Sequence, residues 1–347
     1  MVTPSTGTRT EDRLARVDPD ARLDLSIVVP VYEERDNLKP LHEQITSALD
    51  ALPYTSEIVY VDDGSQDGSV DVLREIAAGD SRTRAVRFRR NFGQTAAMSA
   101  GFDYARGAVI ITMDADLQND PADIPKLLEL MKQGNDVVSG WRKDRKDPFI
   151  NRRLPSILAN ALISKITGVY LHDYGCTLKA YRRAVMQNVH LYGEMHRFIP
   201  ALANWVGGKV TEVPVNHQAR QFGTSKYGIA RTFKVVLDLF TVKFLLQYSK
   251  GPMQIFGKIG MWFGVPGILA VGWMVVAHLS YLLFGTEVGS MLVKRPFWVI
   301  GSFMLIFCGI QFVCIGLLAE LQIRTWHESQ DKPIYVIKEI VEPTSEA

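Results

Sequence analysis

Two long runs without a charged side chain constrain the fold of this chain more than any other feature. Residues 259–284 and residues 297–319 contain no Asp, Glu, Lys or Arg. Each run is longer than the roughly 20 residues with which an α-helix crosses the hydrocarbon core of a bilayer. Core helices of a soluble protein are the alternative, but two such runs in succession favour the membrane. We therefore predict two transmembrane helices that form a hairpin within residues 251–322.

The basic residues around these runs predict the side of the membrane on which each part of the chain lies. Lys250 and Lys258 flank the first run and Arg324 follows the second, whereas the short loop between the runs offers only Lys294 and Arg295. Cytoplasmic segments next to membrane helices are enriched in Lys and Arg. We expect a multi-pass protein of the inner or plasma membrane, with the large N-terminal domain and both termini in the cytoplasm.

The segments around the hairpin carry weaker signals. Residues 229–250 combine apolar and basic side chains at helical spacing just before the first run, which predicts amphipathic helices at the membrane interface. Residues 323–347 are a predicted cytoplasmic tail, and within it residues 331–343 alternate well enough for a strand that could pair with another subunit. Residues 1–24 are polar and lack the apolar segment of a signal peptide, which predicts a flexible tail.

Charge, cysteine content and motif content exclude several classes of protein. The net charge of the 347 residues is only +2, so no global field attracts nucleic acid. Cys176, Cys308 and Cys314 are odd in number and scattered, which indicates a reducing compartment without a disulfide framework or a zinc site. No GxGxxG motif follows the first predicted strand, which excludes a nucleotide-dependent oxidoreductase.

Strand-like and helix-like segments alternate along the first part of the chain. The predicted strands are residues 23–32, 56–65, 83–89 and 108–116, and the predicted helices between them are residues 37–52, 67–79 and 93–107. Asp120 and Pro121 then read as the N-cap and first position of another helix. Such alternation predicts an α/β domain, residues 25–228, with a mostly parallel sheet and helices on both faces.

Acidic residues lie at the carboxyl ends of the first, second and fourth predicted strands, where ligands of such sheets gather. Buried carboxylates are costly unless a cation lies near them. Asp114 and Asp116 point to one face of a strand, about 6.6 Å apart along it. If the strand ends between them, both can approach one ion, and hard oxygen ligands of this kind suit Mg²⁺ or Mn²⁺ shared with substrate phosphates.

Seven motifs together resemble those of a known family. VVPVYEE, VDDGSQDGS, RNFGQT and DADLQ follow successive strands, and DYGCTLKAYRR, GEMHRFIPALA and RQFGTSKYG occur later in the chain. They are similar to motifs of family 2 glycosyltransferases with the GT-A fold, and specifically of the polyprenyl-phosphate sugar transferases. That group includes dolichol-phosphate mannosyltransferases and the bacterial undecaprenyl-phosphate glucosyl and aminoarabinosyl transferases. The resemblance extends from about Leu25 to Glu320 and implies a GT-A, Rossmann-like catalytic domain.

The resemblance assigns residues to the donor half of a site. Those implied to bind the nucleotide-sugar are Pro30, Tyr32, Glu34, Asp62, Asp63, Gln94, Asp114 and Ala115. Asp116 is implied to hold the metal on the donor diphosphate, assisted by Asp114 and Gln118. Carboxylates suit the base and ribose because they accept hydrogen bonds from N–H and O–H groups. The chain departs from the family where Glu33 replaces the usual Asn of the first motif, which leaves the contribution of that position open.

A transferase anchored in the membrane is placed to use a lipid whose charged head is recognised by cations. The residues implied to bind phosphate of the acceptor or donor are Arg142, Arg152, Arg153, Ser156, Arg220, Ser225 and Lys226. Guanidinium groups bind phosphate in a bidentate manner. A solvated basic surface facing anionic lipids is the alternative, and it suits Lys143, Arg145 and Lys146.

A phosphate acceptor simplifies the chemistry. Its second pKa lies near 6, so it is mostly dianionic at neutral pH and needs little deprotonation before attack. We therefore expect a single displacement with inversion, which turns an α-linked donor into a β-linked product. The resemblance places Asp173 with Asp116 among the catalytic residues, and Asp173 is either a general base or a group that orients a sugar hydroxyl.

The resemblance favours a UDP-linked donor, with glucose first, undecaprenyl phosphate as acceptor, and a homotetramer. A GDP-mannose-using mannosyltransferase and a non-catalytic, membrane-bound partner that binds nucleotide-sugars are the alternatives. A processive polysaccharide synthase is disfavoured because QIRTW, residues 322–326, lies after the second run and lacks the spacing of that class.

Overall fold

The computed structural model describes residues 23–143, 154–189, 191, 193, 195–218, 252–285, 297–329 and 334–343. The chain divides into two compact units, residues 1–242 with 333–347, and residues 243–332. The predicted interfacial helices, residues 229–250, and the predicted N-terminal tail, apart from its last two residues, lie outside the described residues.

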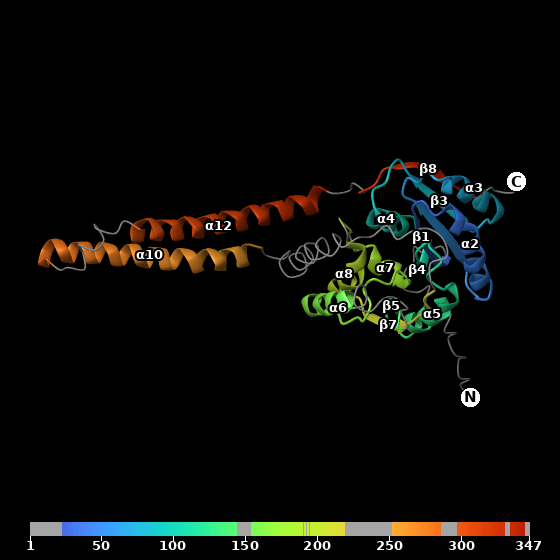
Figure 1. Ribbon diagram of the computed structural model, residues 1–347, viewed down its shortest axis with the longest axis horizontal. Coiled ribbons are helices and arrows are strands. Elements are labelled where there is room, and N and C mark those ends of the chain that lie inside the picture. Colours follow the sequence, from blue (N-terminus) through green and yellow to red (C-terminus); the bar gives the residue numbers. More distant parts are fainter. Residues whose placement is uncertain are drawn as a thin grey trace, which may run out of the picture. The chain divides into compact units, whose positions relative to one another are not determined.

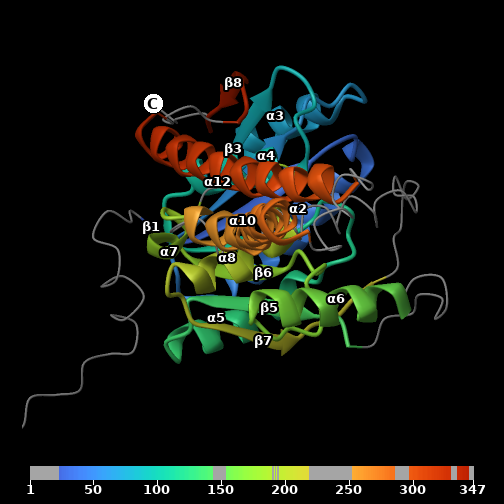
Figure 2. The same ribbon diagram turned by 90° about the vertical axis from the view of Figure 1, so that its left-hand side faces the viewer.

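The first unit is built on one eight-stranded sheet with the order β7-β5-β6-β4-β1-β2-β3-β8. The strands are β1 (Leu23–Val31), β2 (Ser56–Asp62), β3 (Thr83–Phe88), β4 (Gly107–Thr112), β5 (Val137–Trp141), β6 (Lys179–Arg182), β7 (Val210–Pro214) and β8 (Ile337–Val341). β1 to β4 are mutually parallel, β5 is parallel to β7, and β6 and β8 pair antiparallel with their neighbours. Figure 2 shows β5 and β7 toward one end of the sheet and β3 and β8 toward the other.

Helices cover both faces of this sheet. They are α2 (Arg35–Asp50), α3 (Ser69–Gly79), α4 (Gln94–Tyr104), α5 (Ile124–Lys132), α6 (Leu154–Thr167), α7 (Arg183–Met186) and α8 (Ile199–Trp205), with short 3₁₀ turns η1 (Pro121–Asp123) and η3 (Met195–Phe198). In β1, Leu25, Ile27 and Val29 pack in the core formed with α2, α3 and α5, whereas Val28 packs in a second core with α4. Successive strand residues point to opposite faces, so a continuous apolar run implies burial on both sides. The predicted α/β fold with a mostly parallel sheet is confirmed.

The ends of two strands differ from the prediction. β2 stops at Asp62 and β4 stops at Thr112, before both Asp114 and Asp116. Leu117 has a φ of 61°, so the chain turns sharply just after the aspartates. The two carboxylates therefore lie on a loop, and the geometry of a strand does not set their spacing. The predicted N-cap is confirmed, since the Asp120 side chain accepts a hydrogen bond from the Ala122 N–H at 3.0 Å.

The strand predicted in the C-terminal tail is present as β8. It pairs antiparallel with β3 of the same sheet, with Val86 opposite Ile340 and Ala85 opposite Val341. The tail strand therefore extends the sheet of its own chain.

The second unit consists of α10 (Pro252–Phe284) and α12 (Phe297–Ser329), which lie side by side in Figure 1. Within them Phe256–Phe284 and Phe297–Ala319 are long and apolar enough to cross a membrane, by length and composition. Glycine lets the helices approach closely: a Cβ on Gly309 would lie 2.7 Å from the Gly260 carbonyl oxygen, and one on Gly267 would lie 2.9 Å from the Ile306 nitrogen. Small residues at such contacts are typical of helix pairs in membranes.

Candidate active site

The acidic residues predicted to meet at one edge of the sheet do so. β1, β2 and β4 are parallel neighbours, so their carboxyl ends share an edge. Asp62 is the last residue of β2 and Asp63 follows it. Asp114 and Asp116 follow β4, and Glu34 lies at the N-cap of α2, just after β1. This edge therefore carries a concentration of carboxylates, as binding sites in α/β sheets do at strand ends.

The backbone before α4 holds the Asp63 carboxylate. Its oxygens accept hydrogen bonds from the Phe92 N–H at 2.6 Å and from the Gly93 N–H at 2.9 Å. Gly64, with a φ of 73°, allows this contact, because a Cβ there would lie 2.5 Å from the Arg90 carbonyl carbon. The RNFGQT motif therefore contributes backbone donors to the second acidic motif.

Burial raises the pKa values of both aspartates of this motif. Removal from water raises the pKa of Asp63 to about 6, although the two backbone donors and Arg90 oppose the shift. Burial also raises the pKa of Asp62, whose Oδ1 accepts from the Ser65 N–H at 3.3 Å. The Oδ2 of Asp62 has no hydrogen-bond partner among the described residues, and the Arg87 Nε lies 3.9 Å from it. A ligand that donates a hydrogen bond would satisfy this oxygen.

Asp114 is held by side chains from two other segments. Its Oδ1 accepts from the Gln94 amide at 3.0 Å, and its Oδ2 accepts from the Thr177 hydroxyl at 2.8 Å. The Asn119 side-chain oxygen accepts from the Asp114 N–H at 3.0 Å and lies 3.0 Å from the Thr177 hydroxyl. The first residue of α4 and the segment before β6 thus fix this carboxylate.

Asp114 and Asp116 form an acidic pair in a poorly solvated place. Burial first, and the neighbouring charge of Asp116 second, raise the pKa of Asp114 to about 6. Asp116 is itself buried, and its Oδ1 accepts from the Gln118 N–H at 3.2 Å. No group of three His, Cys, Asp or Glu side chains suited to a metal occurs among the described residues. The candidate cation ligands in this place are therefore the two carboxylates of Asp114 and Asp116.

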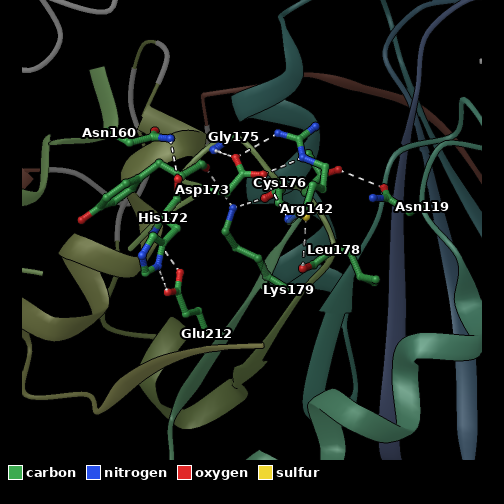
Figure 3. A network of polar contacts seen from close by, with 12 residues as sticks. Asn119, Arg142, Asn160, His172, Asp173, Gly175, Cys176, Leu178, Lys179 and Glu212 are labelled. Atoms are coloured by element: carbon green, nitrogen blue, oxygen red, sulfur yellow. Dashed lines mark hydrogen bonds and ion pairs between the residues drawn. The ribbon is translucent and has the colours of Figure 1, made fainter. Parts of the chain in front are cut away.

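Arg142 and Asp173 form a buried bidentate ion pair. The Arg142 Nε donates to Asp173 Oδ2 at 2.7 Å and its Nη2 donates to Oδ1 at 3.0 Å (Figure 3). The Gly175 N–H also donates to Oδ1, at 3.0 Å. Burial alone would lower the pKa of Arg142, but the hydrogen bonds and charge of Asp173 raise it above its usual value. Both oxygens of Asp173 are therefore already engaged by a permanent cation.

A second cation, Lys179, lies fully inside the protein beside this pair. Its Nζ donates to the Tyr174 carbonyl at 3.2 Å and to the Cys176 carbonyl (Figure 3). Burial lowers the pKa of Lys179 and raises that of the Cys176 thiol to about 11. Lys179 thus stabilises the backbone turn that carries Asp173 and Thr177.

His172 and His196 have structural partners. The His172 ring stacks on Trp141 with 4.3 Å between ring centroids, and Glu212 binds both its Nδ1 and, at 2.8 Å, its backbone N–H. The His196 Nδ1 lies 2.8 Å from the hydroxyl of Thr95 on α4, where His196 is buried.

The remaining predicted site residues divide into two groups. Pro30 lies in β1, Tyr32 follows that strand, Ala115 is buried between the two aspartates, and Ser156 is partly buried in α6. The predicted phosphate ligands outside the described residues are Arg152, Arg153, Arg220, Ser225 and Lys226.

Sequence reasoning missed the residues that position the carboxylates. The contacts of Thr177 with Asp114 and Asn119 join segments about 60 residues apart, which periodicity does not reveal. The signal for Lys179 was available, since a lysine at the start of the buried strand β6 requires polar partners.

Comparisons with known proteins identify the family of the chain. The sequence model of glycosyl transferase family 2 matches residues 26–189. The dodecaprenyl-phosphate galacturonate synthase of Rhizobium johnstonii is 42% identical over 95% of this chain and 96% of that protein. The chain belongs to glycosyl transferase family 2. An undecaprenyl-phosphate 4-deoxy-4-formamido-L-arabinose transferase of Edwardsiella ictaluri is 40% identical over 91% of the chain and 94% of that protein. The predicted membership among the polyprenyl-phosphate glycosyltransferases of this family is confirmed.

Solved structures support the fold of the catalytic domain. Glucosyl-3-phosphoglycerate synthase from Mycobacterium tuberculosis, solved with Mn²⁺ and UDP-glucose, covers 69% of this chain and 84% of its own, with a TM-score of 0.51 and 16% sequence identity. At this identity the likeness concerns the fold alone, and it agrees with the predicted GT-A architecture.

Proposed function

We propose that this family 2 enzyme transfers a sugar from a UDP-linked donor to a membrane polyprenyl phosphate, with inversion at the anomeric carbon. The observation that carries the proposal is the meeting of two acidic motifs, Asp62-Asp63 and Asp114 with Asp116, at one edge of the sheet. The first offers acceptors for base and ribose, and the second offers ligands for a metal on the diphosphate. The names of the relatives support a polyprenyl phosphate acceptor.

The residues present fit a divalent cation. Asp114 and Asp116 are hard oxygen donors, and burial first and the neighbouring Asp116 second raise the pKa of Asp114, although Arg142 and Lys179 oppose the shift. Gln118 is the predicted third ligand, and its backbone N–H already orients Asp116. When bound, a Mg²⁺ or Mn²⁺ ion would neutralise the charge that develops on the departing diphosphate. The solved structure with Mn²⁺ and UDP-glucose supports a metal in this fold.

The ion pair with Arg142 argues against the general-base role of Asp173. A carboxylate whose two oxygens both accept from one guanidinium is a poor proton acceptor, because protonation would break the pair. The acceptor phosphate needs no strong base. We infer a positioning role that differs from orientation of a sugar hydroxyl by Asp173 itself: Asp173 fixes Arg142 just after β5, and the remaining N–H donors of Arg142 can then bind a phosphate or a sugar hydroxyl.

In the proposed reaction a phosphate oxygen of the lipid attacks the anomeric carbon, and the bond from that carbon to the diphosphate oxygen breaks. UDP leaves, and the product is a polyprenyl-monophosphate sugar. The protein aligns the lipid phosphate with the donor diphosphate. It does so in a site with little water, where each electrostatic interaction is stronger than in bulk water.

The connectivity of the sheet supports a hairpin that returns to its starting side. β8 follows α12 in sequence but lies in the same sheet as β1 to β7. The chain therefore begins and ends its passage through α10 and α12 on one side of any membrane that these helices cross. With the basic flanks, this supports a cytoplasmic catalytic domain and tail.

The names of the relatives add further candidates for the transferred sugar. Glucose is the expectation from the resemblance, while galacturonate and 4-deoxy-4-formamido-L-arabinose occur in the names of similar proteins. GDP-mannose stays as the alternative donor.

The test is a donor panel with purified full-length protein and undecaprenyl phosphate in detergent. Radiolabelled UDP-glucose, UDP-galacturonate, UDP-4-deoxy-4-formamido-L-arabinose and GDP-mannose are each offered with Mg²⁺, Mn²⁺ or EDTA, and Asp116→Asn is the control. We expect metal-dependent transfer from a UDP-sugar and none by the variant. Transfer only from GDP-mannose would refute the UDP donor. UDP binding without transfer from any donor would favour a non-catalytic partner.

A further inference from the structure

The C-terminal segment that follows the second apolar helix packs against the loop that holds Asp63. We propose that Tyr335, in this segment, is a positioning residue for donor binding, which acts through the backbone of residues 88–93. This inference rests on the proposed function, because it takes Asp63 as part of the nucleotide site. It adds a part of the chain that belongs to none of the motifs above.

An aromatic chain of contacts runs from Tyr335 to Asp63. The Tyr335 ring stacks on Phe88 at the end of β3, with 5.1 Å between centroids and 13° between planes. Phe88 meets the edge of Phe92 at 5.8 Å. The Phe92 N–H then donates to Asp63 Oδ1 at 2.6 Å. Tyr335 is 7% exposed, so its ring is a packed part of this chain.

The backbone of the same segment adds a second contact. The Val336 carbonyl accepts a hydrogen bond from the Arg89 N–H at 3.1 Å, just beyond the end of β3. Residues 89–93 include both N–H donors to Asp63, and their backbone at Arg90 lies so close to Gly64 that a Cβ there would clash. Residues 335 and 336 therefore contact the same segment, residues 88–93, that donates two backbone hydrogen bonds to the Asp63 carboxylate.

A third contact reaches the other acidic motif. The Tyr335 hydroxyl donates to Asp103 Oδ2 at 2.8 Å. Asp103 lies near the end of α4, and the first residue of that helix, Gln94, donates to Asp114 at 3.0 Å. Tyr335 therefore packs against both elements that enter the site from this side, the loop and α4.

The strand β8, which follows Tyr335 and Val336, is attached in another way and provides a matched control. Glu339 pairs with Arg74 at 2.7 Å, and Ile340 faces Val86 in the ladder with 40% of its surface exposed. These contacts tie the strand to β3 and α3 and do not involve the loop of residues 89–93. Ile340→Ala should therefore weaken the strand without moving the loop.

Loss of the stack should act on the donor and not on the chemical step. In Tyr335→Leu the loop loses its aromatic support, and we expect the UDP dissociation constant and the donor KM to rise roughly threefold to tenfold, the size of one aromatic pair. The kcat at saturating donor should stay near that of the wild type. Tyr335→Phe keeps the ring and should restore most of the affinity, and Ile340→Ala should bind UDP as the wild type does.

The pH dependence of UDP binding is a measurement that a general loss of stability would not change. Asp63 accepts two N–H donors from the loop, faces Asp62 on β2, which raises its pKa, and faces Arg90, which lowers it. If Tyr335→Leu retracts the donors, the acid limb of UDP binding should shift to higher pH.

The experiment is calorimetric titration of UDP with Mn²⁺ into full-length wild type, Tyr335→Leu, Tyr335→Phe and Ile340→Ala, each checked for a cooperative thermal transition. Equal affinity of Tyr335→Leu and wild type would overturn the inference, as would an equal loss in Ile340→Ala. Absence of UDP binding by the wild type would instead refute the proposed function on which the inference rests.

Discussion

The pair of Arg142 and Asp173 offers the sharpest test of how this site is built. Neutralising either partner leaves the other as an uncompensated buried charge, so Arg142→Gln and Asp173→Asn should each destabilise the protein. Neutralising both removes the imbalance, because an amide pair can still exchange a hydrogen bond. We therefore expect Arg142→Gln/Asp173→Asn to be more stable than the sum of the single losses predicts.

The magnitude follows from the burial of the pair. Only 15% of the Arg142 side chain and 5% of the Asp173 side chain are exposed. Breaking a buried ion pair on one side costs roughly 3–5 kcal/mol. The lower end applies here, since Asp173 keeps a hydrogen bond from the Gly175 N–H. About 3 kcal/mol lowers the midpoint of thermal unfolding by roughly 6–12 °C in a domain of this size.

The assay is thermal unfolding of the four full-length proteins, followed by tryptophan fluorescence in one detergent. The double variant should recover at least half of the larger single loss. Additive losses would refute the coupling. Transfer kinetics of the same variants test the role of Asp173. If Asp173 orients Arg142, Asp173→Asn should keep the pH profile of kcat, whereas loss of the acid limb of that profile would support a general base.

Two other predictions concern groups that hold the acidic motifs in place. Thr177→Val removes the hydroxyl that donates to Asp114, so the pKa of Asp114 should rise further and Mn²⁺ affinity in the presence of UDP should fall roughly 10–100-fold, as measured by electron paramagnetic resonance. Unchanged affinity would contradict this. Gly64→Ala places a Cβ 2.5 Å from the Arg90 backbone and should weaken UDP binding roughly tenfold or more, whereas Gly134→Ala, with a φ of 90° and nothing within 4 Å, shares only the backbone strain. Equal effects on UDP binding would show that strain, not the clash, is responsible.

The sequence predicted the strands and the acidic loops of this site, because these depend on the local pattern of apolar and charged residues. A continuous apolar strand such as residues 27–31 indicated burial on both faces, and the observed cores confirm it. Acidic residues directly after these strands had to meet at one edge, since parallel neighbours end together. Two uncharged runs similarly required a pair of long apolar helices.

What the sequence could not provide is the choice of partners between distant segments. Arg142 was expected to bind phosphate, yet the structure pairs it with Asp173, 31 residues away. Thr177 and Asn119 join two motifs that sequence reasoning treated separately. Each such pairing depends on how segments cross in three dimensions, and a carboxylate or guanidinium is compatible with several partners until the fold selects one.

The raised pKa of Asp63 leads to a last prediction, on stability and binding together. Its value of about 6 in the folded protein exceeds the ordinary aspartate value, because burial disfavours the charge. An acid with a raised folded pKa stabilises the fold at low pH, and that contribution is lost as pH rises through the folded pKa. The unfolded chain is already ionised above about pH 4, so stability from this group should fall between about pH 4 and about pH 6 and stay level above.

Asp63→Asn removes this titration while it keeps a side-chain oxygen for the Phe92 N–H. Relative to the wild type, the variant should therefore gain thermal stability as pH rises toward 6, while its UDP binding should be weak and lose the acid limb at which wild-type binding declines. Thermal unfolding and UDP titration at matched pH values measure both. A constant difference in stability between the two proteins across this range would show that Asp63 ionises as freely when folded as when unfolded. A variant that gains stability and loses UDP binding would mean that the fold tolerates an unfavourable buried carboxylate because the ligand requires it.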